Sequence, residues 1–184
     1  MPRIKNILEY VDYFRQLAVR HKDIKHNPLS EDGDAPIGSR KFYRTSAGEV
    51  LSALPKDIGF PMVTVELYDN VPKENNKYDI QGKFTGAFMV IDQANPKNFT
   101  EQLAAHATGE RILYQFLQQM WGDHYGKNIN RQETPFKDID FGAMDIVFVT
   151  GIFNGQCFGV RCEFNFEIEQ HKKIATPPDA GIFE

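Results

Sequence analysis

His106 and Glu110 are the two side chains of this sequence whose types and spacing come nearest to a metal site. They lie four residues apart in a segment with helical periodicity, so both project from one helix face, as two metal ligands would. A metal ion needs further ligands, and the sequence supplies no second matched pair. We therefore interpret His106 and Glu110 as an ordinary exposed helix pair near Arg111, and we predict no bound metal.

Asp123 and His124, in "WGDHYGK", are a second combination that could act chemically, as an orienting carboxylate and a base. No nucleophile lies near them, and neighbouring polar residues after a helix usually form a solvated cap. The acidic run at Glu31, Asp32 and Asp34 lacks the twelfth-position Glu of a calcium loop. We also find no phosphate loop, zinc-protease helix or nucleophile elbow. The sequence predicts no cofactor and no identifiable catalytic residue, although an enzyme without a recognisable motif stays open.

The two cysteines, Cys157 and Cys162, lie five residues apart on one predicted strand. An odd offset sends the two side chains to opposite faces of a sheet. We therefore predict neither a disulfide between them nor a shared metal, and we expect a buried free thiol for at least one.

Composition and charge narrow the class of protein. The 184 residues fit one domain over 1–184, with 41% hydrophobic and 25% charged residues. The net charge of -4 provides no basic field for a nucleic acid. No apolar run approaches the roughly 20 residues that span a bilayer, and the N-terminus does not resemble a signal peptide, so we expect no membrane contact and a cytoplasmic location. The fifteen Phe residues indicate a Phe-rich core.

The N-terminal part of the chain shows one clear element. Apolar residues recur at helical spacing over 4–19, which predicts an amphipathic helix. Residues 21–41 mix Pro, Gly, Ser and acidic residues without periodicity and predict a long mobile loop. A capping-box pattern predicts a short helix over 46–54, and Pro177-Pro178 favours an extended C-terminal arm over 171–184.

The rest of the chain predicts an α+β domain. Alternating residues predict strands over 60–70 and 83–92, joined by a polar loop over 69–78. A long helix follows, capped by Asn98 or Thr100 and ended by Gly122. Its predicted apolar face consists of Leu103, Ala107, Leu113, Tyr114, Phe116, Leu117, Met120 and Trp121. With a long C-terminal hairpin, this gives a four-stranded, mainly antiparallel sheet on which the N-terminal helix and the long helix pack.

The C-terminal hairpin, "MDIVFVTGIFNGQCFGVRCEF", carries the functional hypothesis. A two-residue turn at Asn154-Gly155 pairs Val149 with Val160 and Val147 with Cys162. One face then collects an ordinary core, formed by Val147, Val149, Phe153, Phe158, Val160, Cys162, Phe164 and Phe166. The other face combines apolar and charged residues, which predicts a contact surface of Met144, Ile146, Phe148, Thr150, Ile152, Arg161 and Glu163. Its apolar half is covered either by the chain's own helix or loop or by a neighbouring subunit.

This order of elements resembles the tail-terminator (tail-completion) proteins of tailed phages and related contractile particles. The resemblance lies in an N-terminal helix, the Pro-led strand "FPMVTVELYD", a helix across the sheet and the closing strand "GVRCEFNFEIE". It implies a structural protein that forms a ring or another homo-oligomer and contacts other particle components, without catalytic residues. The long loop over 21–41 and the polar insertion after Asp69 depart from the pattern.

Two hypotheses follow from the sequence. The first is a non-enzymatic assembly protein whose hairpin face makes the contacts. The second is a small-molecule-binding or enzymatic domain, with an apolar pocket between the sheet and the long helix and with His106, Glu110 or Tyr114 as its polar anchors. Fold alone does not separate them, because function depends on the site.

Overall fold

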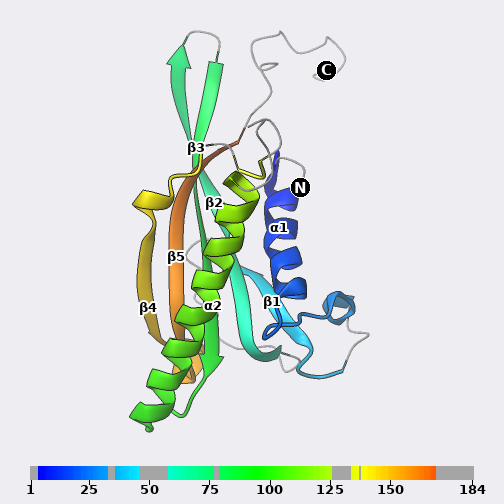
Figure 1. Ribbon diagram of the computed structural model, residues 1–184, viewed down its shortest axis with the longest axis vertical. Coiled ribbons are helices and arrows are strands. Elements are labelled where there is room, and N and C mark those ends of the chain that lie inside the picture. The colour runs from blue at the N-terminus through cyan, green and yellow to red at the C-terminus, as the bar shows by residue number, and fades with distance from the viewer. Residues whose placement is uncertain are drawn as a thin grey trace, which may run out of the picture.

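A mixed sheet of five strands forms the body of the protein, and two helices lie side by side across one of its faces (Figure 1). The structure is a computed structural model that describes residues 4–32, 36–45, 58–76, 79–125, 134–136 and 138–168. The two covering helices are α1 (Ile7–Arg20) and α2 (Phe99–Tyr125). The α+β class predicted from the sequence is therefore confirmed.

The strands follow the spatial order β1-β2-β3-β5-β4, so β1 and β4 are the two edges of the sheet. Their bounds are Arg40–Thr45 for β1, Ile58–Asn76 for β2, Asp79–Gln93 for β3, Asp145–Gly151 for β4 and Cys157–Ile168 for β5. β1 is parallel to β2, and all other neighbours are antiparallel. Three short helical segments complete the described elements: η1 (Pro28–Asp32), η3 (Phe141–Ala143) and α3 (Ile152–Gly155).

Four strands were predicted, but the sheet has five, because β1 was not predicted from the sequence. Its sequence "RKFYRT" has only two apolar residues, and Phe42 and Tyr43 are adjacent instead of alternating. The pairing of β1 with β2 shifts in register between Arg40 and Phe42. Phe42 is buried in the main core under α1, whereas Tyr43 packs against the smaller cluster on the opposite face. The strand begins inside the segment 21–41 that was predicted to be a loop. The described part of that segment also contains η1 and the buried residues Ile24 and His26.

The predicted polar loop over 69–78 is also corrected, because β2 continues to Asn76 and β3 begins at Asp79. This end of the β2–β3 hairpin extends beyond the helices, where neither face of a two-stranded ribbon needs to be apolar (Figure 1). The predicted short helix over 46–54 and the predicted arm over 171–184 lie outside the described residues.

The predicted start of α2 is confirmed, and its predicted end is wrong. The Asn98 side-chain oxygen accepts hydrogen bonds from the backbone N–H groups of Thr100, at 3.1 Å, and Glu101, at 3.3 Å, which makes Asn98 the cap. The helix does not stop at Gly122 but continues to Tyr125. Leu103, Tyr114 and Trp121, predicted on its apolar face, are exposed, whereas Ala105, Gly109 and Ile112 are buried.

The core between the helices and the sheet is built largely from aromatic rings, as the Phe count indicates. Tyr10 and Phe14 of α1 pack on Phe166, Phe88 and Phe164 of the sheet. The Tyr10 ring stacks on the Phe166 ring with centroids 5.6 Å apart and planes at 3°. A smaller cluster on the other face contains Met62, Ile91, Phe153 and Cys157. Within the described residues, no helix is both long enough and apolar enough to cross a membrane.

Candidate interaction surface at the β4 edge

The connection between β4 and β5 determines which side chains β4 presents on each face. The predicted two-residue turn at Asn154-Gly155 was wrong. The chain makes the helical turn α3 instead, in which Phe153 and Asn154 have left-handed φ values of 52° and 58°. Ile152 still opposes Cys157, as the predicted turn requires, but Phe148 then opposes Val160. An extra residue at Thr150–Gly151 has therefore shifted the register of β4 by one.

This shift exchanges the two faces of β4 relative to β5. Val147 opposes Arg161 instead of Cys162, and Ile146 opposes Cys162. Ile146 and Phe148 therefore face the helices, whereas Arg161 and Glu163 face away from them. The predicted combination of Ile146 and Phe148 with Arg161 and Glu163 on one face is therefore wrong, and Val147 and Val149 lie on the Arg161 face instead. The predicted core positions Val147 and Val149 are not buried, and Val147 has 41% of its surface exposed.

Five of the seven predicted contact residues divide into a half-buried group and an exposed group. Met144 and Ile146 are half-buried against the main core, and Ile152 is half-buried against the smaller cluster. Thr150 is exposed, and Phe148 has 62% of its surface exposed. The Phe148 ring contacts the ring of His106 on α2 edge-to-face, with centroids 5.2 Å apart. The chain's own helix therefore supports one side of Phe148 and leaves the rest of the ring open.

Two glycines allow close packing next to this edge: Gly109 lets α2 approach β3 and β5, and Gly159 lets β5 approach β3. A Cβ atom on Gly109 of α2 would lie 2.8 Å from the Val90 carbonyl oxygen and 3.2 Å from the Gly159 Cα. A Cβ atom on Gly159 of β5 would lie 2.0 Å from the same oxygen. This approach brings His106, one turn before Gly109, to the sheet, where its Nδ1–H donates to the Gly159 carbonyl at 2.9 Å. His106 thus has a structural partner, while its predicted pocket companions Glu110 and Tyr114 are half-buried and exposed.

Arg161 and Glu163 belong to an ion-pair network on the opposite face of the sheet. Arg161 donates from Nε and Nη2 to the two carboxylate oxygens of Glu66, at 2.7 and 2.9 Å, and from Nη1 to Glu163 at 3.0 Å. These bonds to Glu66, on β2, span the middle strand β3. They raise the pKa of the Arg161 guanidinium above its usual value. Glu66 was not among the predicted residues, because its partner lies 95 residues away and only the sheet brings the two together.

The second predicted combination, Asp123 and His124, is also tied into the fold. Asp123 accepts hydrogen bonds from the Tyr13 hydroxyl at 3.1 Å and from Gln119 Nε2 at 2.8 Å. Burial and the neighbouring carboxylate raise the pKa of Tyr13 well above its usual value. The His124 ring packs on Tyr125. These residues link the end of α2 to α1 instead of forming a solvated cap.

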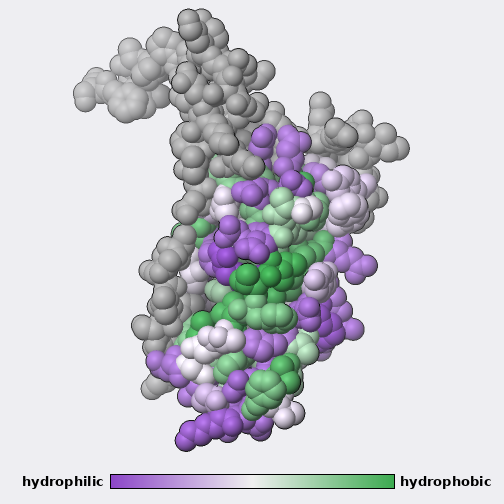
Figure 2. All heavy atoms as spheres, turned by 90° about the vertical axis from the view of Figure 1, so that its left-hand side faces the viewer, coloured by the Kyte–Doolittle hydropathy of each residue, from purple (hydrophilic) through white to green (hydrophobic). Residues whose placement is uncertain are grey.

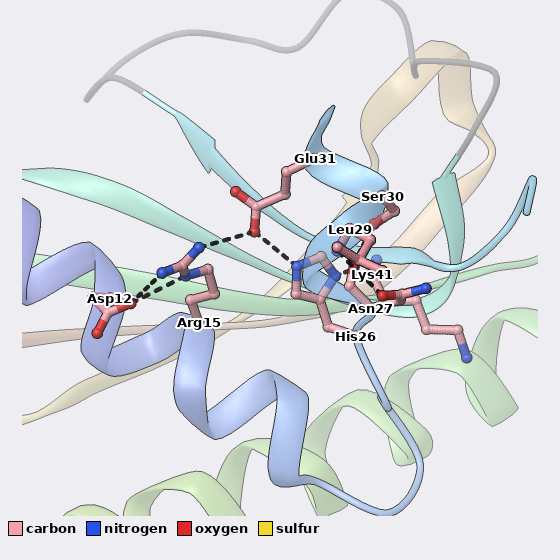
Figure 3. A network of polar contacts seen from close by, with 8 residues as sticks. All are labelled: Asp12, Arg15, His26, Asn27, Leu29, Ser30, Glu31 and Lys41. Carbon is pink, nitrogen blue, oxygen red and sulfur yellow. Dashed lines mark hydrogen bonds and ion pairs between the residues drawn. The ribbon is translucent and has the colours of Figure 1, made fainter. Parts of the chain in front are cut away.

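His26 forms the centre of a polar network at the other edge of the sheet (Figure 3). Its Nδ1 accepts the Lys41 backbone N–H at 3.2 Å, and its Nε2–H donates to Glu31 at 2.8 Å. Arg15, which is also paired with Asp12, lies 3.9 Å from the same Glu31 oxygen. Burial of the His26 ring lowers its pKa from the ordinary value of 6.5. The network joins α1 and η1 to the start of β1.

A pocket of about 950 Å³ lies beside this network, between α1 and β1. Its lining includes Ile4, Leu8, Arg15, Phe42, Tyr43 and Arg44. His106, Glu110 and Tyr114 do not line it, so the pocket is not where the second hypothesis expected one. No group of three His, Cys, Asp or Glu side chains within the described ranges is placed to hold a metal ion.

Both cysteines are buried free thiols on opposite faces of β5, as predicted. Burial raises the pKa of each thiol to about 12. The raised pKa makes both poor nucleophiles at neutral pH.

The exposed feature that remains is the edge strand itself. We define the β4 edge surface as Val147, Phe148, Val149 and Thr150. Among the described residues β4 pairs with β5 alone, so the backbone groups on its outer side have no strand partner. Figure 2, which views the molecule from the β4 side, shows hydrophobic side chains gathered in the middle of this side with hydrophilic ones around them. Comparisons with known proteins add no relative, since no family model and no curated protein matches the chain.

Proposed function

We propose that this chain is a non-enzymatic assembly protein that associates with itself through the β4 edge surface. The observation that carries the proposal is the exposure of apolar side chains on both faces of an edge strand. Val147 is 41% exposed on one face, and Phe148 is 62% exposed on the other. A partner strand would bury both and would also satisfy the outward backbone groups.

The part of β4 over 146–149 supports this proposal because it contains none of the charged residues or Pro that often keep edge strands from pairing. Natural edges are blunted by charged residues, Pro, or a covering segment. Residues 146–152 contain no charge and no Pro. An apolar edge that no segment covers among the described residues favours a strand contact in the assembled state. Self-assembly is also what the resemblance to tail-terminator proteins implies.

The polar groups that could do chemistry support a structural function. His106 is bonded to the Gly159 carbonyl, Asp123 to the Tyr13 hydroxyl, and Arg161 to Glu66. Each of these bonds joins two elements of the fold. None of these groups is free to act on a substrate without breaking a contact that holds the domain together.

Light scattering coupled to gel filtration over a range of concentrations tests the proposal. We expect concentration-dependent association, and we expect Phe148→Ser to weaken it by about 30-fold, because a buried aromatic contact is worth about 2 kcal/mol. Leu29→Ser is the matched control, since Leu29 is also 62% exposed but lies in η1, beside β1. A chain that stays monomeric up to millimolar concentration would contradict the proposal.

The pocket between α1 and β1 favours a second candidate function, the binding of a small molecule. Its volume of about 950 Å³ falls within the range of ligand sites, and apolar Ile4 and Phe42 line it together with Arg44. A thermal-shift screen tests this candidate, because a ligand that binds only the folded state raises the melting temperature. A flat response across apolar and anionic compounds would remove it.

A further inference from the structure

The two edges of the sheet differ in a way that bears on how two copies would meet. We infer that β4 of one copy pairs with β4 of a second copy, antiparallel and across a two-fold axis, so that the two sheets join into one. This inference rests on the proposed self-association. It replaces the head-to-tail contact of a ring, in which different surfaces meet, by a contact between identical surfaces.

The β1 edge is a poor acceptor for a partner's β4. A head-to-tail contact would need it, because β1 is the opposite edge of the same sheet. The backbone next to the start of β1 is already bonded to the chain's own loop: Asn27 N–H donates to the Ser39 carbonyl at 3.2 Å, and Lys41 N–H donates to His26 at 3.2 Å. His26 is only 3% exposed. A partner strand would have to expose this ring and replace both bonds.

The β4 strand is complementary to itself. In an antiparallel pair centred on Phe148, this residue faces its own copy and Val147 faces Val149, while Asp145 lies toward the irregular Thr150–Gly151 end of the partner strand. In a pair centred on Val147, Asp145 faces Val149. Both arrangements keep the two Asp145 carboxylates apart, whereas a parallel pair in register would set them side by side. Because Asp145 is the only charged residue of β4, no other like-charge contact arises along the strand.

The faces of the two sheets also match under this symmetry. A two-fold axis perpendicular to the sheet keeps the helix-covered faces of both copies on the same side. The exposed Phe148 rings lie on the helix-covered face beside His106. They are directly opposite each other in the pair centred on Phe148 and diagonal neighbours in the pair centred on Val147. On the other face, Val147 meets Val149 in the first pair and its own copy in the second. One strand contact therefore buries the apolar side chains on both faces of β4.

Disulfide trapping tests the symmetry, because only a two-fold axis brings a residue next to its own copy. We would make Val147→Cys and Phe148→Cys separately, with Leu29→Cys as the control of equal exposure. Opposite residues of an antiparallel pair have Cα atoms about 4.5–5.5 Å apart, within reach of a disulfide. The native Cys157 and Cys162 are both 0% exposed, so they do not compete. We expect oxidised glutathione to convert one of the β4 variants to a covalent dimer and to leave the Leu29→Cys chain monomeric.

The outcomes separate this inference from the proposed function. A wild-type chain that never associates contradicts both. Association that Phe148→Ser weakens, but with no disulfide at 147 or 148, overturns the two-fold contact and leaves the proposed function standing. A closed particle of three or more copies would also overturn the two-fold contact and leave the proposed function standing, because a single two-fold contact joins only two copies.

Discussion

The two edge strands of the sheet are protected to very different degrees. At β1, the chain's own segment around His26 bonds to the backbone near the strand's start, and α1 and η1 are tied to it through Glu31 and Arg15. At β4, α2 packs closely on the neighbouring strands β3 and β5, and its His106 ring contacts Phe148 on the helix-covered face. A buried polar network closes the β1 edge, whereas the β4 edge carries exposed apolar side chains and pairs with no further strand in the described part of the chain.

This difference indicates that the β1 edge contributes to the stability of the fold, and that the β4 edge contributes to the proposed association. A buried histidine with both ring nitrogens bonded strengthens the fold, because removing it leaves groups without partners. An exposed Phe on an edge contributes little to the folded monomer. Substitutions at the β1 edge should therefore change stability and leave association intact, and substitutions at the β4 edge should do the reverse.

The largest effect on folding is expected for His26→Ala. The change removes a buried ring, leaves the Lys41 N–H and Glu31 without this partner, and opens a cavity. We expect it to lower the free energy of unfolding by about 3 kcal/mol, measured by urea denaturation. Leu29 lies three residues away, and its side chain is exposed. The free energy of unfolding of Leu29→Ala should therefore stay within about 0.5 kcal/mol of the wild-type value. Equal losses for the two variants would contradict a specific closure of the β1 edge by His26.

Gly109→Ala tests the support behind the other edge. The added methyl group would meet backbone atoms of β3 and β5, so α2 must move away and His106 must lose its bond to the Gly159 carbonyl. We expect a loss of about 2 kcal/mol in the free energy of unfolding. Gly122→Ala is the same change on the same helix, with nothing within 4 Å of the new atom, and should stabilise the protein by up to about 1 kcal/mol. Similar effects at the two glycines would contradict the close approach of α2.

These two edges also show what the sequence could predict about the fold. The patterns of β2 and β3 and the capping residues near Asn98 are local signals. They predicted the existence of both strands and the start of α2, although β2 extends through most of the predicted loop over 69–78 and β3 begins directly after it, at Asp79. The strand β1 was missed because its pairing with β2 compensates for a weak local pattern. Gly109 and Gly159 were missed because a close approach between two elements has no signature in either segment alone.

The site was predicted less well than the fold, and the reason is one residue of register. Asn154-Gly155 is the usual signal for a tight turn, but Phe153 and Asn154 adopt left-handed conformations that favour glycine. The extra residue at Thr150–Gly151 then turned every side chain of β4 to the other face. The exposed position of Phe148 survives this change, because an edge strand is open from either face. Arg161, the predicted neighbour of Phe148, lies on the opposite face of the sheet, where it pairs with Glu66.

The pH dependence of the free energy of unfolding tests the state of His26 at the β1 edge. Burial lowers the pKa of His26 below its ordinary value of 6.5, so the unfolded chain binds this proton more readily than the folded chain. The contribution of the neutral ring is present above pH 6.5 and is lost as the pH falls toward the lowered pKa. Glu31, Arg15 and Arg40 are the charged groups that act on the ring. Urea denaturation at pH 7.5 and pH 5.5 should therefore show a larger loss for the wild type than for His26→Ala. A difference that is the same in both proteins would contradict a neutral His26 in the folded state.

The smallest effect on folding is expected at β4, and this is where the comparison between the edges can be broken. Phe148→Ser removes a ring that is 62% exposed, so in dilute solution the free energy of unfolding should change by less than about 0.5 kcal/mol. The same protein should show the loss of association described above, because the ring matters only when a partner strand covers it. Denaturation at a second, high concentration makes the contrast direct, since an associating protein gains stability with concentration by mass action. We expect this gain in the wild type and in Leu29→Ser but not in Phe148→Ser. If Phe148→Ser unfolds the monomer as readily as His26→Ala does, then β4 is an integral part of the fold and the contrast between a closed and an open edge is wrong.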